Sequence, residues 1–321
     1  MSVLTTMKDV FKITLPTPFP VGDVNVYVVR GDKLTLIDAG AKTEEAWQTF
    51  KYQLGELGYK PSDIEQVVIT HHHPDHVGLL DYLNDELPVI GHPKNQPWIS
   101  QDEVFFQKNE PFYLELFTQF GIDPAFIKNV DMTNELRYSC HRSLTMSVVE
   151  GDSLPGMMGW RVIETPGHAQ SHIVLYRQED GLLIAGDTIL AKISPNPLLE
   201  PPQFGETTRP RPLVQYNASL RKLQKLQMTK VVTGHGDDVN LPHELIQKRL
   251  DSQKERAYGV LHMLREQPMT AFEVCTRLFP KVFHKQPVLT MSETVGQLDF
   301  LEDLGEINIE VVNKQFIYHT K

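Results

Sequence analysis

The stretch that decides the fold is Thr70-His71-His72-His73-Pro74-Asp75-His76. Its pattern His-x-His-x-Asp-His places four side chains able to bind a metal, namely His71, His73, Asp75 and His76. Imidazole and carboxylate groups are common ligands of zinc and related divalent metals. So many polar groups would be costly to gather in one place unless a metal paired them. A metal site is therefore expected here, with a solvated polar loop as the alternative.

The residues around this stretch predict where it lies in a sheet. Residues 64–70 end in an apolar, β-branched run that is typical of a buried strand. Pro74 would end that strand, and Gly78-Leu79-Leu80 would open a helix. The candidate ligands would then occupy a strand-to-helix turn at the carboxyl end of a strand, where open sheets commonly carry their functional groups.

Further candidate residues follow other predicted strands. Residues 24–29 and 33–38 predict a hairpin that turns at Gly31-Asp32. Asp38 ends this hairpin, where it is either a turn former or an acid that orients a ligating imidazole. Three later turns repeat the arrangement, with glycine beside the polar residue in each, and they contain His168, Asp187 and His235.

Composition sets the broad class. The chain has 321 residues, a formal net charge of −10 and only two cysteines, Cys140 and Cys275. These two cysteines match no metal spacing and fit a reducing compartment. No run of about 18 apolar residues is present, and Met1 to Val10 lacks a signal-peptide core. We expect a cytoplasmic protein with no membrane partner, and the acidic charge argues mildly against nucleic-acid binding.

With these residues in order, the chain resembles the metallo-β-lactamase-fold hydrolase superfamily over roughly residues 10–240. The resemblance is carried by His71-x-His73-x-Asp75-His76, then His168 in a Pro-Gly-His turn, Asp187 in Gly-Asp and His235 in Gly-His-Gly. Asp38 matches the early acid of the family. The presence of Asp75 and His76 together with Asp187 looks like the dinuclear glyoxalase II and ribonuclease Z branches, and no cysteine stands at a ligand position.

The resemblance implies an α+β fold, a four-layer αββα sandwich with the site at one edge of its two sheets. It also implies two divalent metal ions, zinc in the first place, with iron or manganese as alternatives. His71, His73 and His168 would hold one metal and Asp75, His76 and His235 the other. Asp187 would bridge the two metals, and a hydroxide between them would be the nucleophile. Asp75 and Asp187 are the candidate catalytic residues because either carboxylate is placed to receive a proton.

Two segments outside the motif are candidates for substrate binding. Residues 95–135 concentrate aromatic side chains in a helical stretch, which is either an insertion with its own small core or a cap over the metal site. Residues 193–212 form a proline-rich loop whose Arg209 and Arg211 would either contact an anionic substrate or remain solvated.

The pattern changes near residue 242, so residues 1–241 are expected to form the catalytic domain and residues 242–321 a second domain. A helix over 243–266, a capping box from Thr270 to Glu273, a helix capped by Ser292 and a hairpin around Asn313-Lys314 resemble a winged helix. Related hydrolases of the β-lactamase-like-protein-2 type carry such a tail. From Lys248 onward, ten acidic residues balance ten basic ones, and the expected recognition helix has no Lys or Arg. Packing or homodimer formation is therefore favoured over nucleic-acid binding for this domain.

The sequence thus predicts a metal-dependent hydrolase that acts on a small-molecule thioester or ester. A metal-dependent ribonuclease or phosphodiesterase is the first alternative, and it would require a basic groove. A non-catalytic winged-helix regulator with a relict metal site is the second. The metal ions set the reaction type, whereas the cap and loops set the substrate, so the substrate does not follow from these motifs.

Overall fold

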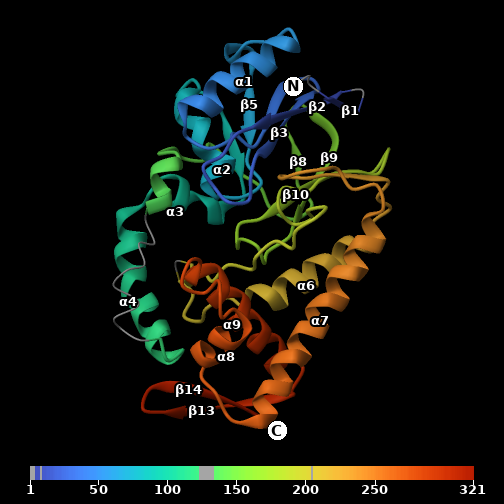
Figure 1. Ribbon diagram of the computed structural model, residues 1–321. Helices are drawn as coiled ribbons and strands as arrows, with labels where there is room; N and C mark the ends of the chain where they lie inside the picture. The colour runs from blue at the N-terminus through green and yellow to red at the C-terminus, as the bar shows by residue number, and fades with distance from the viewer. Residues whose placement is uncertain (1–3, 8, 123–133, 204) are drawn as a thin grey trace.

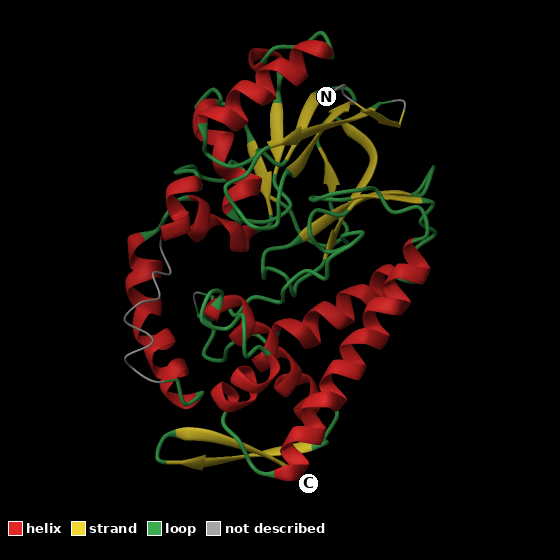
Figure 2. Ribbon diagram, in the orientation of Figure 1, coloured by secondary structure: helices red, strands yellow, loops and turns green. Residues whose placement is uncertain are grey.

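The computed structural model describes residues 4–7, 9–122, 134–203 and 205–321, and it contains two large sheets (Figures 1 and 2). The first sheet has seven strands in chain order, antiparallel from β1 to β4 and parallel from β4 to β7. Its strands are β1 (Leu4–Met7), β2 (Val10–Leu15), β3 (Val24–Arg30), β4 (Leu34–Ile37), β5 (Gln66–Val68), β6 (Val89–Gly91) and β7 (Met146–Ser147).

The second sheet has five strands in the order β12-β11-β10-β9-β8, and only its β11–β12 pair is parallel. Its strands are β8 (Ser153–Leu154), β9 (Met157–Glu164), β10 (Ile173–Arg177), β11 (Leu182–Ile184) and β12 (Lys230–Val232). A separate hairpin, β13 (Ile307–Val312) and β14 (Gln315–Thr320), lies near the C-terminus (Figure 2).

Buried apolar side chains form one core between the two sheets and further cores on their outer faces. Val29, Ile37 and Val68 of the first sheet share the inner core with Trp160 and Leu175 of the second. On the outer face of the first sheet, helix α1 (Glu44–Glu56) buries Phe50 and Leu54. Alternation along a strand sends successive side chains to opposite faces, so central strands such as β5, with Val67 and Val68, contribute to two cores.

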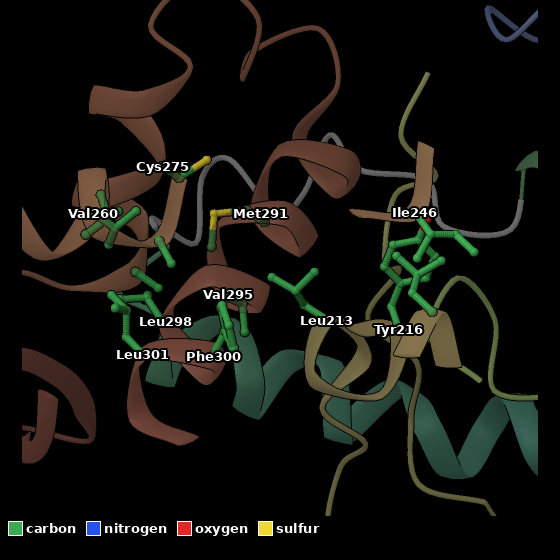
Figure 3. Close-up of a cluster of buried hydrophobic side chains, with 14 of the residues drawn as sticks. Leu213, Tyr216, Ile246, Val260, Cys275, Met291, Val295, Leu298, Phe300 and Leu301 are labelled. Carbon is green, nitrogen blue, oxygen red and sulfur yellow. The ribbon is translucent and has the colours of Figure 1, made fainter. Parts of the chain in front are cut away.

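The outer face of the second sheet is covered by α6 (Pro212–Leu223) together with the C-terminal helices α7 (Pro242–Glu266), α8 (Ala271–Leu278) and α9 (Pro287–Asp303). Figure 3 shows side chains from these helices meeting in one cluster, among them Leu213, Tyr216, Ile246, Val260 and Leu298. The cluster includes Val174 and Leu183 from the second sheet, so the C-terminal helices share a core with the sandwich.

Helix α4 (Glu103–Gln119) runs along one side of the molecule, from α3 (Gln96–Ile99) toward the C-terminal hairpin (Figure 1). Its lower end is fixed by the C-terminal region, where Phe272 N donates to Phe120 O at 3.0 Å. The expected helical segment over 95–135 is therefore confirmed for its described part, while residues 123–133 of that range lie outside the described residues.

The local sequence signals are confirmed at several helix starts. Thr43 caps α1 by accepting from Ala46 N, and Thr270 with Glu273 forms the expected capping box of α8. No helix among the described residues is long and apolar enough to cross a membrane.

Three boundary predictions were wrong. The metal-binding turn enters its helix at Pro74 rather than at Gly78, because proline suits the first helical position, and α2 spans Pro74–Val77. Proline has the same effect at Pro287, so α9 begins five positions before Ser292, which is an interior residue and not a cap. The helical spacing of apolar residues over 213–228 also predicts a helix of that length, whereas α6 ends at Leu223.

Candidate metal centre

The predicted ligands converge on one edge of the two sheets, at strand ends. Asp38 follows β4, His71 and His73 follow β5, and Asp75 and His76 lie in α2. From the second sheet, His168 follows β9, Asp187 follows β11 and His235 follows β12. Residues from positions 38 to 235 therefore meet because their strands end at the same edge.

The converging side chains form three overlapping groups able to hold a metal: His71 with His73 and His168, His71 with His76 and Asp187, and Asp75 with His76 and His235. Within each group the potential ligand atoms lie within 4.8 Å of one another. Asp187 stands between the groups, because its Oδ2 lies 3.5 Å from both His168 Nε2 and His235 Nε2, and its Oδ1 lies 3.5 Å from His76 Nε2.

The unpaired atoms of the cluster fit a metal better than they fit a hydrogen-bonded core. His76 Nε2, His168 Nε2 and Asp187 Oδ1 are buried and have no hydrogen-bond partner among the described residues. Buried polar atoms without partners are uncommon because each costs free energy. Coordination of a divalent cation would satisfy these atoms, and imidazole with carboxylate is a suitable donor set for zinc, iron or manganese.

The other ring nitrogen of several imidazoles is fixed by the protein. Asp38 Oδ2 lies 2.8 Å from His76 Nδ1, while the backbone carbonyls of Asn196 and Asp23 lie 2.8 Å from the Nδ1 atoms of His168 and His235. Such contacts set the tautomer and the orientation of a ligating histidine. Each of these rings therefore presents Nε2 to the centre.

Asp38 adopts a backbone conformation that is rare for residues other than glycine, with φ at 60°. Hydrogen bonds hold it there, since Thr70 N donates to Oδ1 at 2.7 Å and Thr70 Oγ1 donates to Oδ2 at 2.8 Å. Of the two roles left open for Asp38, its contact with His76 supports the orienting role.

Charges in the cluster favour a bound cation. Burial opposes ionisation of Asp187, but His235 and His76 hold its pKa well below the ordinary value. Burial would lower the pKa of His235, yet Asp187 and Asp75 raise it to about 10. Burial and the neighbouring rings of His76 and His73 hold the pKa of His71 well below its usual value. A divalent metal would replace the protons that these carboxylates retain on His76 and His235.

A glycine lets Asp187 reach the centre. A Cβ at Gly234 would collide with Asp187 Oδ1 and lie 3.0 Å from His76 Cε1. Any larger residue at position 234 would displace a candidate ligand. Glycine is therefore required here because of the lack of space beside Asp187, and not only because it allows a sharp turn.

Two buried histidines near the centre escaped the sequence analysis. His172 Nε2 accepts from Asp187 N at 3.1 Å, and its ring stacks on His71 with centroids 4.7 Å apart. His72 Nδ1 lies 2.9 Å from Ser171 Oγ, and the His72 ring stacks on Trp98. Nothing in the local pattern distinguishes them, because their role comes from partners distant in sequence.

Arg209 and Arg211 are paired with acidic residues of α9. Arg209 forms a bidentate salt bridge with Asp299 of α9, and Arg211 Nη2 donates to Glu302 Oε2 at 2.9 Å. These contacts support neither of the two roles left open, substrate contact or a solvated loop charge, because the arginines join the 193–212 loop to α9.

Comparison with known proteins decides the family. The family model described as the metallo-beta-lactamase superfamily matches residues 19–235, about two thirds of the chain. This chain belongs to the metallo-β-lactamase superfamily. The matched region contains Asp38 and each of the candidate ligands.

Relatives of this superfamily protein extend over the C-terminal helices as well. A "Probable metallo-hydrolase YqjP" of Bacillus subtilis is 49% identical over 92% of this chain and 93% of its own length. A "Beta-lactamase-like protein 2 homolog" of Caenorhabditis elegans is 26% identical over 82% of this chain and 73% of its own. The crystal structure of TTHA1429 from Thermus thermophilus, a metallo-beta-lactamase family protein, matches with a TM-score of 0.81 and 26% identity, over 99% of this chain and 100% of the other.

Proposed function

We propose that this protein is a dinuclear metal-dependent hydrolase that acts on a small-molecule thioester or ester. The observation that carries the proposal is the convergence of His76 Nε2, His168 Nε2 and Asp187 Oδ1, which are buried and have no hydrogen-bond partner among the described residues, within one cluster of histidines and carboxylates. Similarity to a relative named as a metallo-hydrolase over nearly its full length supports the reaction class. Zinc is the first expectation for the metals, with iron or manganese as alternatives.

The protein groups have separate roles in this proposal. His71, His73 and His168 would hold one metal, Asp75, His76 and His235 the second, and Asp187 both. Bound divalent metals supply Lewis acidity and lower the pKa of water, so that a nucleophile is available at neutral pH. Asp75 has an oxygen 3.3 Å from His235 Nε2, and its carboxylate would accept a proton from water during turnover. Asp38 and the Asn196 carbonyl hold the rings of His76 and His168 in position.

An uncharged substrate is favoured over a phosphodiester. Binding along a nucleic-acid backbone draws on Lys and Arg side chains, and Arg209 and Arg211 are engaged by α9. The carboxyl group of Glu135 lies near the cluster, since burial and the charge of Asp75 raise its pKa. The ribonuclease alternative therefore has less support.

We also propose a four-layer sandwich followed by a winged-helix-like C-terminal unit. Helices cover the outer face of each sheet, which supports the four-layer αββα arrangement. Helices α7 to α9 followed by the β13–β14 hairpin support a winged-helix-like unit over residues 242–321. In α9, however, residues 290–301 are buried, which supports a packing role rather than nucleic-acid recognition or DNA regulation.

A turnover assay with counted metals tests the proposal. Purified protein is offered a thioester such as S-lactoylglutathione, a lactone, a phosphodiester and single-stranded RNA, with His73→Ala as the control. Metal-dependent thioester or lactone turnover that the variant loses is the expected result. RNA cleavage that the same variant loses would instead show that the protein is a nuclease. Metal binding without hydrolysis of any of these compounds would favour the non-catalytic regulator.

A further inference from the structure

A reciprocal pair of side-chain amides joins α6 to the turn that carries His168. Gln170, two residues after His168, donates from Nε2 to Gln215 Oε1 at 2.8 Å, and Gln215 Nε2 donates back to Gln170 Oε1 at 3.0 Å. The Gln170 side chain is only 4% exposed, so water has little access to it. Because hydrogen bonds are directional, two of them between planar groups fix the orientation of the turn on the helix as well as its distance.

Two further contacts bring the same turn against α6. Ser219 Oγ donates to the carbonyl of Pro166 at 2.8 Å. Gly167 packs so closely on the helix that a Cβ there would lie 2.5 Å from the Cα of Tyr216. The turn is therefore held on α6 at residues 166, 167 and 170.

The helix also contacts the turn that carries Asp187, the proposed bridging ligand. Tyr216 Oη donates to the carbonyl of Thr188, the residue after Asp187, at 3.0 Å. Tyr216 is 1% exposed, so its hydroxyl is shielded from water. One residue of α6 thus touches both turns, since its backbone lies against Gly167 and its hydroxyl holds Thr188.

The helix is itself fixed in a core. Leu213, Leu220 and Leu223 of α6 are fully buried there, in the same cluster as Ile246 of α7 and Val295 of α9 (Figure 3). Ligands carried by turns that rest on a rigid element stay within the narrow range of positions that metal coordination needs. Helix α6 is therefore a suitable support for two ligands that must lie at a set distance from each other.

We propose that Gln215 and Tyr216 are positioning residues of the metal centre. Gln215 would hold His168 in place through its hydrogen bonds with Gln170. Tyr216 would hold Asp187 in place through the carbonyl of the next residue. Asp187 Oδ2 lies 3.5 Å from His168 Nε2, and the two contacts with α6 together set this separation. This inference rests on the proposed function, in which His168 serves one metal and Asp187 both.

The test measures metal binding in variants that keep the shape of each side chain. Gln215→Met removes the amide pair but retains an unbranched side chain of similar length, and Tyr216→Phe removes the hydroxyl alone. Cobalt titration followed by absorbance reports the two sites separately. Gln215→Met should bind cobalt about tenfold more weakly at the site that contains His168 and normally at the other. Tyr216→Phe should weaken both sites several-fold, because Asp187 is shared between them.

Gln224→Met is the matched control, because Gln224 follows the last residue of α6 and pairs its amide with Gln247 at the surface. This variant should bind cobalt as the wild type does. Gln170→Met removes the other half of the amide pair and should reproduce the effect of Gln215→Met, while the double variant should bind no more weakly than either single one. Wild-type affinity at both sites in Gln215→Met, or an equal loss at both, would overturn the inference while leaving the hydrolase proposal intact.

Hydrogen exchange in the metal-free protein separates this inference from the proposed function. The Gln170 N–H donates to Glu200 Oε1 at 2.8 Å, so its exchange reports how firmly the turn is held. Exchange in the peptide that contains residues 166–170 should become several-fold faster in Gln215→Met and stay unchanged in Gln224→Met. Wild-type exchange in that peptide of Gln215→Met would reject the positioning role, whatever the protein proves to bind or hydrolyse.

Discussion

At the scale of single residues, the carboxylate of Asp38 shows how a group outside the ligand set can control the metal site. It accepts from Thr70 and faces His76 Nδ1 at 2.8 Å, so it holds the imidazole with Nε2 toward the centre. Among the charges that outweigh burial and raise the pKa of His76, Asp187 ranks first and Asp38 second. Losing the carboxylate should therefore weaken both the orientation and the basicity of this ligand.

We expect Asp38→Asn to bind metal about tenfold or more weakly at the proposed site that contains His76, since orienting groups usually contribute that much to affinity. Competition with a chromophoric chelator measures this change directly. Asp81→Asn is a matched control, because Asp81 pairs with Lys42 away from the centre. Unchanged affinity for both metals in Asp38→Asn would show that Thr70 and the fold alone position His76.

A second prediction at this scale concerns pH and Glu200. Burial raises the pKa of this carboxyl to about 8, against an ordinary value of 4.5, while the Gln170 N–H and Lys94 partly oppose the shift. Between these values the native state keeps a proton that the unfolded chain has released. Stability should therefore fall as pH rises through this window, by at most about 1.4 kcal/mol per pH unit from this one group.

Chemical denaturation at several pH values between about 5 and about 8 checks the sign. In Glu200→Gln this part of the pH dependence should disappear, because the amide does not titrate. A variant with the same slope as the wild type would mean that Glu200 is already ionised in the folded protein.

The candidate ligands could be predicted from the sequence because each of them is marked locally. His71 to His76 form a dense motif, and Asp187 and His235 follow apolar strands beside glycine. Glu200, Trp98 and His172 have no such mark. Their roles depend on partners brought together by the fold, as when the Glu200 carboxyl meets Gln170 N thirty positions away.

At the scale of elements, the 190–200 segment connects the metal cluster to the C-terminal helices. Its Asn196 carbonyl faces His168 Nδ1, and the Asn196 side chain donates to Leu289 O at 2.9 Å. Leu199 N donates to Ser292 Oγ at 3.1 Å, and Arg249 of α7 donates to the Ile193 carbonyl at 2.7 Å. Helices α7 and α9 therefore hold the backbone that orients a candidate ligand.

Ser292→Ala removes one of these anchors without touching the metal cluster. We expect the site formed by His71, His73 and His168 to bind its metal several-fold to about tenfold more weakly, while the Asp75–His76–His235 site is unaffected. Cobalt titration followed by absorbance distinguishes the two sites. Tyr258→Phe on α7, which loses one exposed contact with Glu306, is the control. Equal weakening at both sites would indicate a general loss of structure instead.

Helix boundaries were harder to predict than helices, and α9 shows why. Ser292 stands before an apolar run and has the chemistry of a cap, so the pattern favoured a start there. The helix instead starts at Pro287, and Ser292 uses its hydroxyl to accept from a distant loop. The choice between a cap and a tertiary contact is made by packing, which the local pattern does not contain.

At the scale of the whole molecule, the question is whether residues 242–321 fold separately from the sandwich. The core on the outer face of the second sheet contains Val174 and Leu183 from the sandwich and Val260 and Leu298 from the C-terminal helices. Ion pairs add to this contact, since Arg209 in the loop binds Asp299 of α9, a residue that is almost fully buried. A shared core of this kind favours one cooperative unit over two independent domains.

Leu298→Ala tests this cooperativity, because Leu298 is fully buried and belongs to the shared cluster (Figure 3). Removing a buried leucine side chain costs about 2–5 kcal/mol, from lost apolar burial and the cavity that remains. If the molecule is one unit, the whole unfolding transition shifts by that amount. Fluorescence from the three tryptophans, Trp47, Trp98 and Trp160, which all precede residue 242, and far-UV circular dichroism, dominated by the helices, would then still coincide. A variant in which the helical signal is lost first, while the tryptophan transition and the metal content stay as in the wild type, would establish residues 242–321 as an independent domain. We do not expect that outcome, because unfolding of α9 would break the contacts of Asn196 and Leu199 with this helix. Those contacts hold the backbone that orients His168.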